Sequence, residues 1–115
     1  MNKIILMGRL VRDPELKYTE NKNKAYTKFI IAVQRNFRLA DGTREADFIP
    51  VRIWGKKAAV ICKYLRKGNY ITVSGSLRVS NYEDKDGNRK YITEVVGEDF
   101  KFVSENYHDK DNGTE

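Results

Sequence analysis

The chain has 115 residues, a length that suits one domain with a single hydrophobic core and is too short for two. Residues 1–103 carry 21 Lys and Arg against 12 Asp and Glu, a net charge of +9, whereas residues 104–115 carry 1 against 4, or −3. Such a basic domain favours nucleic acid or an anionic membrane surface as its partner, although many basic proteins bind neither.

The composition also argues against several classes of protein. No run of about 18 apolar residues is present, and the start of the chain lacks the charged, apolar and cleavage regions of a signal peptide. We therefore expect a cytoplasmic protein with no membrane partner. The single cysteine, Cys62, permits no internal disulfide, and the single histidine, His108, lies in a polar tail, so no zinc-binding cluster can form. We expect no metal and no cofactor.

The first half of the chain predicts three strands. The first runs from Lys3 to about Arg12 and stops at Asp13-Pro14, because proline lacks an N–H and fixes φ. The second, residues 25–37, is rich in β-branched and aromatic side chains, and the third covers residues 46–54. The first strand is apolar at alternate residues, so an exposed edge there would invite pairing with another chain.

One helix is predicted, in the stretch KKAAVICKYLRKGN. Ala58, Ile61, Cys62 and Leu65 recur there at i, i+3, i+4 and i+7 and form one apolar stripe. Basic residues accumulate toward its end, and Gly68 is the expected stop.

The second half predicts a long hairpin. NYITVSGSLRVSNY alternates between an aliphatic face and a polar or aromatic face, and EDKDGNRK is a turn in which Asp86-Gly87 supplies positive φ. A fifth strand runs from Lys90 to about Val96, with DFKFV as a candidate extension of its pairing. Residues 104–115 show no periodicity and are predicted to be disordered.

Five strands with one helix between the third and the fourth are the order of an OB-fold, an all-β Greek-key barrel that binds oligonucleotides or oligosaccharides. The strand count alone leaves an SH3-like barrel or an α+β sandwich open, and the position of the helix favours the OB-fold. We expect an OB-fold domain at residues 1–103 and a short polar tail at 104–115.

Aromatic and basic side chains accumulate away from the aliphatic face of these strands. In the third strand, alternation separates Phe48, Arg52 and Trp54 from the aliphatic residues at 49, 51 and 53. Single-stranded nucleic acid requires this combination, because each base offers a π-face for stacking and each nucleotide a phosphate for neutralisation. The candidate stacking residues are Phe37, Phe48, Trp54 and Tyr82, and the candidate basic residues are Arg35, Arg52, Lys56 and Arg78.

Each of these residues alone has a plainer explanation. A lone tryptophan at a strand end is more often buried, Phe48 is divided evenly between core and site, and a single basic residue most often serves solubility. Phe37 and Tyr82 lie beside predicted loops and are harder to bury. Only the coincidence of both classes favours a binding surface.

Several segments, in this order, resemble the bacterial single-stranded DNA-binding protein (SSB) family from Met1 to about Val103: NKIILMGRLVRDPELKY, FIIAVQRNF, ADFIPVRIWGK, YLRKG and SGSLRVSNYEDKDGNRKYITEVV. The resemblance implies a non-enzymatic OB-fold homotetramer that wraps single-stranded DNA without sequence preference, in replication, recombination, repair or DNA uptake. It also implies a nucleoid-associated location in a bacterium, or a phage origin. Family members stack bases on aromatics that match the four candidate rings, of which only Trp54 is an indole here.

The tail departs from the family. Members that organise replication end in Asp-Asp-Ile-Pro-Phe, which docks partner enzymes, whereas this chain ends HDKDNGTE. We therefore expect no recruitment of replication and repair enzymes through such a tip. A competence-type or phage version of the family, or a truncated chain, would have such an end.

Two other functions stay open at this point. A nuclease would hold a metal with Glu83, Asp84 and Asp86, but these lie in a Gly-containing turn for which solvation is a sufficient explanation. An RNA-binding OB module of the translation or cold-shock type, or an interaction module of replication-restart complexes, uses the same residue classes. Competition between single-stranded DNA, RNA and duplex separates these cases.

Overall fold

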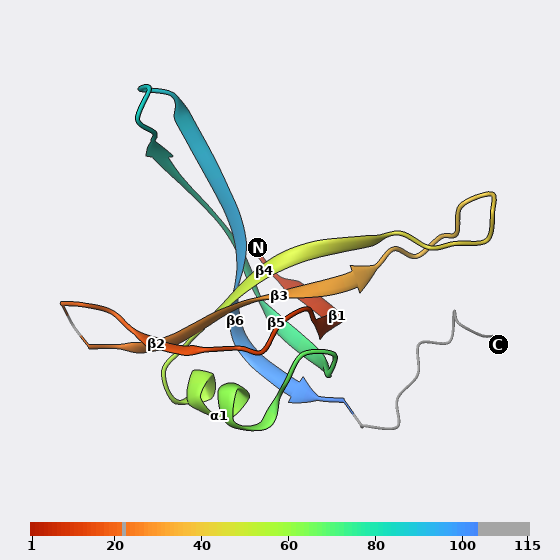
Figure 1. Cartoon of the computed structure of the whole chain (residues 1–115), viewed down its shortest axis with the longest axis horizontal. Coiled ribbons are helices and arrows are strands. Elements are labelled where there is room, and N and C mark those ends of the chain that lie inside the picture. Colours follow the sequence, from red (N-terminus) through yellow and green to blue (C-terminus); the bar gives the residue numbers. More distant parts are fainter. Residues whose placement is uncertain (22, 104–115) are drawn as a thin grey trace.

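The computed structural model describes residues 1–21 and 23–103, and the predicted disordered tail at 104–115 lies outside them. The described part contains, in order, β1 (Ile4–Leu10), β2 (Leu16–Tyr18), β3 (Ala25–Gln34), β4 (Ala46–Trp54), α1 (Lys56–Tyr64), β5 (Tyr70–Glu83) and β6 (Arg89–Phe102). The sheet order is β1-β5-β6-β4-β3-β2, and an additional pairing of β1 with β3 closes a barrel (Figure 1). The predicted all-β barrel, with its helix between the third and fourth barrel strands, is confirmed.

The barrel interior is built by the alternation that the sequence predicts. β3 and β4 are antiparallel, with Phe29 opposite Val51 and Ile31 opposite Ile49, so aliphatic side chains of both strands meet on the inner face. Burial of each large aliphatic side chain contributes about 1.5–3 kcal/mol. The buried core comprises Leu10, Phe29, Ile31, Val51, Ile53, Ala58, Ile61, Leu65, Ile71, Val73 and Val95.

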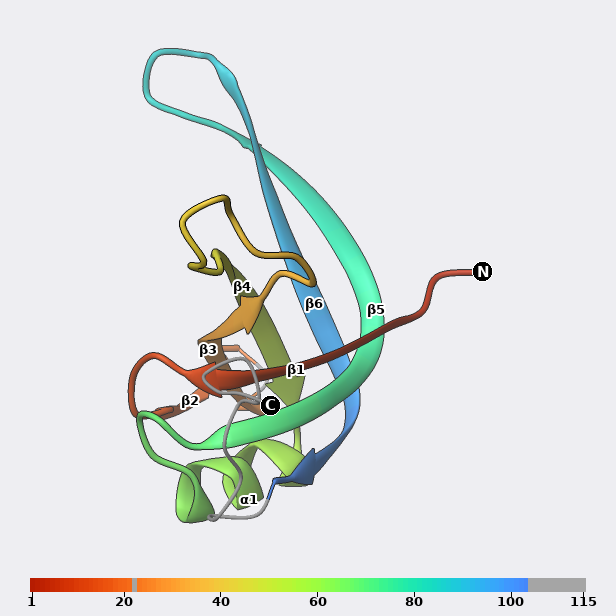
Figure 2. The ribbon, with the colours of Figure 1, turned by 90° about the vertical axis from the view of Figure 1, so that its right-hand side faces the viewer.

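The helix α1 lies at one end of the barrel (Figures 1 and 2), where Ala58 and Ile61 are buried. It ends at Tyr64, because Leu65 adopts extended backbone while its N–H still donates to the carbonyl of Ile61. The prediction of Gly68 as its stop is therefore wrong. Local hydrogen bonds explain the early end, since the Asn69 side chain accepts from the backbone N–H of residue 66 at 2.7 Å.

In the first half of the chain, two strand ends and one strand differ from the prediction. β1 ends at Leu10 and β3 at Gln34, so the predicted ends at Arg12 and Phe37 are too late. The short strand β2, which pairs Leu16–Tyr18 with the start of β3, was missed. Three residues after a proline give too few alternating positions to reveal a strand.

The strands β5 and β6 form a hairpin that projects beyond the barrel (Figure 2). The predicted fifth strand continues past Val96 to Phe102, which confirms DFKFV as an extension. The register shifts between Ser74 and Gly75, and Glu98 is the extra residue on the β6 side. Such a bulge switches the faces of the strand, so Val95 before it and Phe100 after it both point toward the core. Because the bulge at Glu98 interrupts the alternation of inward and outward side chains, the periodicity of the sequence does not reveal that the strand continues beyond it.

No helix within residues 1–21 and 23–103 is long and apolar enough to cross a membrane.

Candidate nucleic-acid interface

The outer face of β3 and β4 presents the residues that alternation separates from the core. Residues directly opposite each other in an antiparallel pair lie on the same face of the sheet. The cross-strand pairs on this face are Tyr26–Trp54, Lys28–Arg52, Ile30–Pro50 and Ala32–Phe48.

All four candidate rings are substantially exposed to solvent. The exposed fraction is 59% for Phe37, 63% for Phe48, 40% for Trp54 and 49% for Tyr82. Burial, the plainer explanation for Trp54, is therefore wrong, and Phe48, which the sequence divides evenly between core and site, lies outside the core. Rings left in water on a basic surface remain available for contact with a ligand.

The four rings do not converge on one pocket. Phe48 and Trp54 lie near opposite ends of β4, Phe37 lies in the β3–β4 loop, and Tyr82 lies near the tip of the β5–β6 hairpin. Figure 1 shows the loop and the hairpin projecting in different directions from the barrel. The hollows that Phe37, Trp54 and Phe48 line are separate and measure 940, 620 and 520 Å³. Such a distribution suits a long, flexible ligand that follows the surface.

The loop that carries Phe37 is held by its own hydrogen bonds. The backbone N–H of Leu39 donates to the carbonyl of Thr43 at 2.7 Å. Asp41 accepts from the hydroxyl of Thr43 at 2.7 Å and from its backbone N–H at 3.0 Å, and these bonds lower the pKa of the Asp41 carboxyl. The loop therefore has a defined turn beside Phe37.

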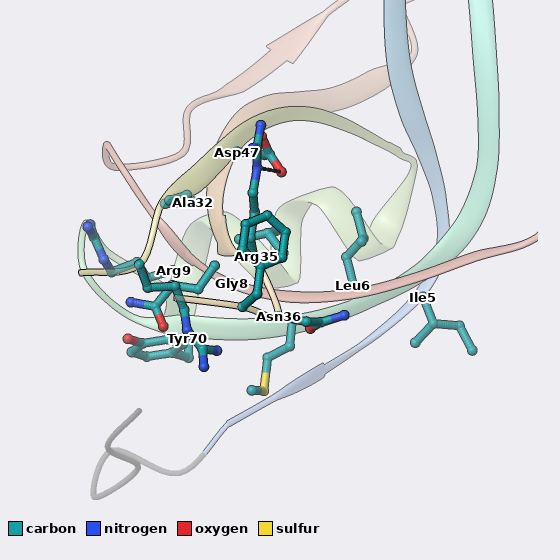
Figure 3. Close-up of a pocket in the computed structure, with 15 residues that line it drawn as sticks. Ile5, Leu6, Gly8, Arg9, Ala32, Arg35, Asn36, Asp47 and Tyr70 are labelled. Atoms are coloured by element: carbon teal, nitrogen blue, oxygen red, sulfur yellow. Dashed lines mark hydrogen bonds and ion pairs between the residues drawn. The ribbon is translucent and has the colours of Figure 1, made fainter. Parts of the chain in front are cut away.

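Arg35 closes the base of the same loop. It donates through Nη2 to Asp47 Oδ1 at 2.9 Å, through Nε to Asp47 Oδ2 at 3.1 Å and through Nη1 to Glu45 Oε1 at 3.0 Å. Figure 3 shows the side chains of Arg35 and Asp47 meeting at the edge of the hollow. Hydrogen bonding to Arg35 lowers the pKa of Asp47, and the same bond raises the pKa of the guanidinium. Two carboxylates thus engage a residue that the sequence predicts to be a phosphate contact.

Arg52 is engaged in a similar way on the outer face of β4. Its Nε donates to Glu94 Oε2 at 3.2 Å, and Lys28 Nζ lies 3.8 Å from Glu94 Oε1. Its guanidinium also lies over two rings, 5.1 Å from the centroid of Tyr26 and 5.7 Å from that of Trp54. Sequence reasoning missed Tyr26, Lys28 and Glu94. Alternation along β3 could have placed Tyr26 and Lys28 on the outer face of the sheet. Their contacts with residues of other strands depend on strand register, which the sequence does not give.

Lys56 and Arg78 differ from the other two candidate cations. Both are exposed, and no carboxylate within the described part of the chain lies at ion-pair distance from either. Their charges are therefore available to an anionic ligand.

The acidic turn of the β5–β6 hairpin has a structural role. Asp84 Oδ1 accepts from the backbone N–H groups of Asp86 and Asn88, each at 2.9 Å. Gly87 has a φ of 83°, so the predicted positive-φ turn is confirmed. Across the described residues, no cluster of three or more His, Cys, Asp or Glu side chains is arranged to hold a metal ion.

Comparisons with known proteins agree with this geometry. The model of the Single-strand binding protein family matches residues 1–103. "Single-stranded DNA-binding protein 1" of Clostridium acetobutylicum is 50% identical over 103 residues, which cover 90% of this chain and 94% of that protein. "Single-stranded DNA-binding protein" of Clostridium tetani is also 50% identical, with 70% of its length covered, and that of Bacillus cereus is 48% identical, with 60% covered. The resemblance inferred from the sequence is confirmed, and the chain belongs to the single-strand binding protein family.

Proposed function

We propose that this protein binds single-stranded DNA without sequence specificity, by stacking bases on exposed rings and neutralising phosphates. The observation that carries the proposal is the exposure of Phe37, Phe48, Trp54 and Tyr82, each at least 40%, on a domain of net charge +9. Strands held in this way stay extended and cannot re-pair. The activity would serve replication, recombination, repair or DNA uptake at the bacterial nucleoid, and it involves binding rather than catalysis.

Stacking explains why the binding does not depend on base sequence. Every base has a π-face, so a ring accepts any of the four, and each stacked base contributes roughly 1–3 kcal/mol. Four platforms therefore give several kcal/mol as an upper bound, before the cost of ordering the strand and non-additivity. Phosphate contacts add a sequence-independent attraction along the backbone.

The basic residues are proposed to contribute unequally. Lys56 and Arg78, for which the described residues supply no ion-pair partner, make direct phosphate contacts. Arg35 contributes less, because it would have to leave Asp47 and Glu45 to reach a phosphate. Arg52 is not proposed as a direct phosphate contact, because its guanidinium already contacts Glu94 and the rings of Tyr26 and Trp54.

The proposed assembly is a homotetramer, and the open edge of β1 supports self-association. Ile4 to Arg9 pair with β5 on one side, whereas on the other side only Arg9 and Leu10 pair with β3. Ile5, at 66% exposure, lies along this open edge. An edge of unpaired backbone groups invites a strand from another chain. Sedimentation equilibrium measures the assembly directly, and a monomer at micromolar concentration would contradict it.

Competition for the protein tests the proposed ligand. Binding of poly(dT) is followed through the emission of Trp54, the single tryptophan of the chain. We expect unlabelled single-stranded DNA to displace it at lower concentration than RNA or duplex DNA of equal length. An RNA-binding module would reverse the order of DNA and RNA, and preference for duplex would exclude the stacking mechanism, because paired bases are already stacked on one another.

Arg78→Ala and Arg35→Ala should have different effects on salt dependence. For a single strand, log K falls with log[salt] with a slope of about −0.7 per phosphate contact. Arg78→Ala should therefore make the slope shallower by about 0.7, whereas Arg35→Ala should change it less, since Asp47 and Glu45 already neutralise that charge. Titrations at four salt concentrations measure both slopes. Equal changes in the two variants would contradict the division between free and engaged cations.

A further inference from the structure

We propose that Arg52 is a positioning residue for Trp54: held by Glu94, its guanidinium lies against the rings of Tyr26 and Trp54 and fixes the indole in the orientation that accepts a base. The inference rests on the proposed function, because it assigns a role within the same DNA-binding surface. It differs from a phosphate contact, the role that the sequence alone suggests for Arg52.

Strand register brings the three side chains together. Arg52 and Trp54 are two residues apart on β4 and therefore share its outer face, and Tyr26 on β3 lies directly opposite Trp54. The centroids of the Tyr26 and Trp54 rings are 5.1 Å apart, with an interplanar angle of 41°. The guanidinium carbon of Arg52 lies within 5.7 Å of both centroids, a distance at which a cation is attracted to the π-system.

Glu94 on β6 anchors the guanidinium. The Glu94 residue is only 8% exposed, and its carboxylate is 3.2 Å from Arg52 Nε. Removing one partner from a buried ion pair destabilises a protein. If Arg52 turned outward to a phosphate, the Glu94 carboxylate would lose its hydrogen bond from Arg52 Nε, so this movement is unfavourable. Lys28 Nζ lies 3.8 Å from Glu94 Oε1, and its side chain is 41% exposed. Arg78 lies opposite Glu94 in the β5–β6 register.

The arrangement leaves Trp54 both supported and accessible. While it contacts Tyr26 and Arg52, the indole also lines a hollow of 620 Å³ whose other walls are Thr19, Glu20, Asn21 and Lys24. A ring already fixed in one rotamer loses less conformational freedom when a base stacks on it, so pre-orientation raises affinity. The hollow beside the β2–β3 turn provides the space for that base.

A double-mutant cycle with R52Q and W54A tests the inference on the full-length protein. Binding of a fluorescently labelled dT oligonucleotide is measured by anisotropy at several salt concentrations, because W54A removes the intrinsic reporter. R52Q should weaken binding about fivefold at every salt concentration, from loss of the cation–π support. In the W54A background the same substitution should have less than about a twofold effect, since residues that act through each other are non-additive.

The free protein gives a second readout. R52Q should lower the steady-state anisotropy of Trp54 without DNA, because the indole gains freedom. K56Q removes an equal charge two residues from Trp54 and is the matched control: it should leave that anisotropy unchanged and make the salt slope shallower by about 0.7. If R52Q destabilises the fold by leaving Glu94 unpaired, the R52Q/E94Q variant removes both charges and keeps the test intact.

The outcomes separate two failures. If R52Q weakens binding equally with and without Trp54 and makes the salt slope shallower, Arg52 is a phosphate contact and the inference is overturned while the proposed function stands. If W54A itself leaves binding unchanged, Trp54 is not a stacking platform, and both the inference and that part of the proposed function are overturned.

Discussion

Replacing Phe48 or Trp54 by alanine should each weaken binding of single-stranded DNA by roughly 1–3 kcal/mol, the value of one stacked base, and should leave the salt slope nearly unchanged. Both rings lie on the outer face of β4 with exposed fractions of 63% and 40%, so their truncation removes contact area for a ligand and little of the core. Anisotropy of a labelled dT oligonucleotide measures the affinity of both variants, and the emission of Trp54 gives a second measurement for Phe48→Ala.

Tyr91→Ala is the matched control for these variants. Tyr91 is 69% exposed on β6, opposite Asn81 in the register, whereas Tyr82 lies opposite Lys90 one position further along. Adjacent positions point to opposite faces, so Tyr91 and Tyr82 occupy different faces of the hairpin. Tyr91→Ala should therefore have little effect on affinity. If Phe48→Ala or Trp54→Ala changed the salt slope as Arg78→Ala does, the separation of stacking from phosphate neutralisation would be wrong.

Gly75→Ala should destabilise the barrel by about 3 kcal/mol, at the upper end of the cost of overpacking. A Cβ at this position would lie 2.0 Å from the carbonyl oxygen of Val96 and 2.9 Å from the Cα of Gly97. Both atoms belong to the backbone of β6 beside the bulge, so relief requires a movement of the strand rather than a change of rotamer. The midpoint of urea denaturation measures the loss.

Ser76→Ala provides the control for that substitution, since Ser76 lies one residue further along β5 and points away from the interior. It should change stability by less than about 0.5 kcal/mol. A tolerated Gly75→Ala would mean that β5 and β6 separate more easily at the bulge than their close approach indicates.

The sequence predicted those parts of the fold in which periodicity and local signals agree. The bounds of β4 are correct because its aliphatic residues alternate without interruption from Ile49 to Ile53. The end of α1 was misplaced because the backbone N–H of Arg66 donates to the side-chain oxygen of Asn69, a hydrogen bond that competes with the helical pattern. The strand β6 appeared shorter because the bulge at Glu98 shifts its alternation by one residue.

The candidate site divides in the same way. Strand parity was sufficient to place Phe48 and Trp54 outside the core, since only a period of two is needed for that prediction. The carboxylates that engage the arginines could not be predicted, because they depend on long-range register. Arg52 and Glu94 are 42 positions apart in the sequence. Charge composition counts such an arginine as free, although its partner lies on a neighbouring strand.

The pairing of β1 with β5 also constrains how the chain folds while it is being made. Ile4 pairs with Gly75 and Arg9 with Tyr70, so the strand that leaves the ribosome early waits for a partner encoded far downstream. At roughly 5–20 residues per second, this delay lasts several seconds. During this delay, the edge of β1 that pairs with β5 in the folded protein has no partner strand within its own chain. Nascent chains on one polysome are therefore exposed to premature pairing of this strand with a neighbouring chain.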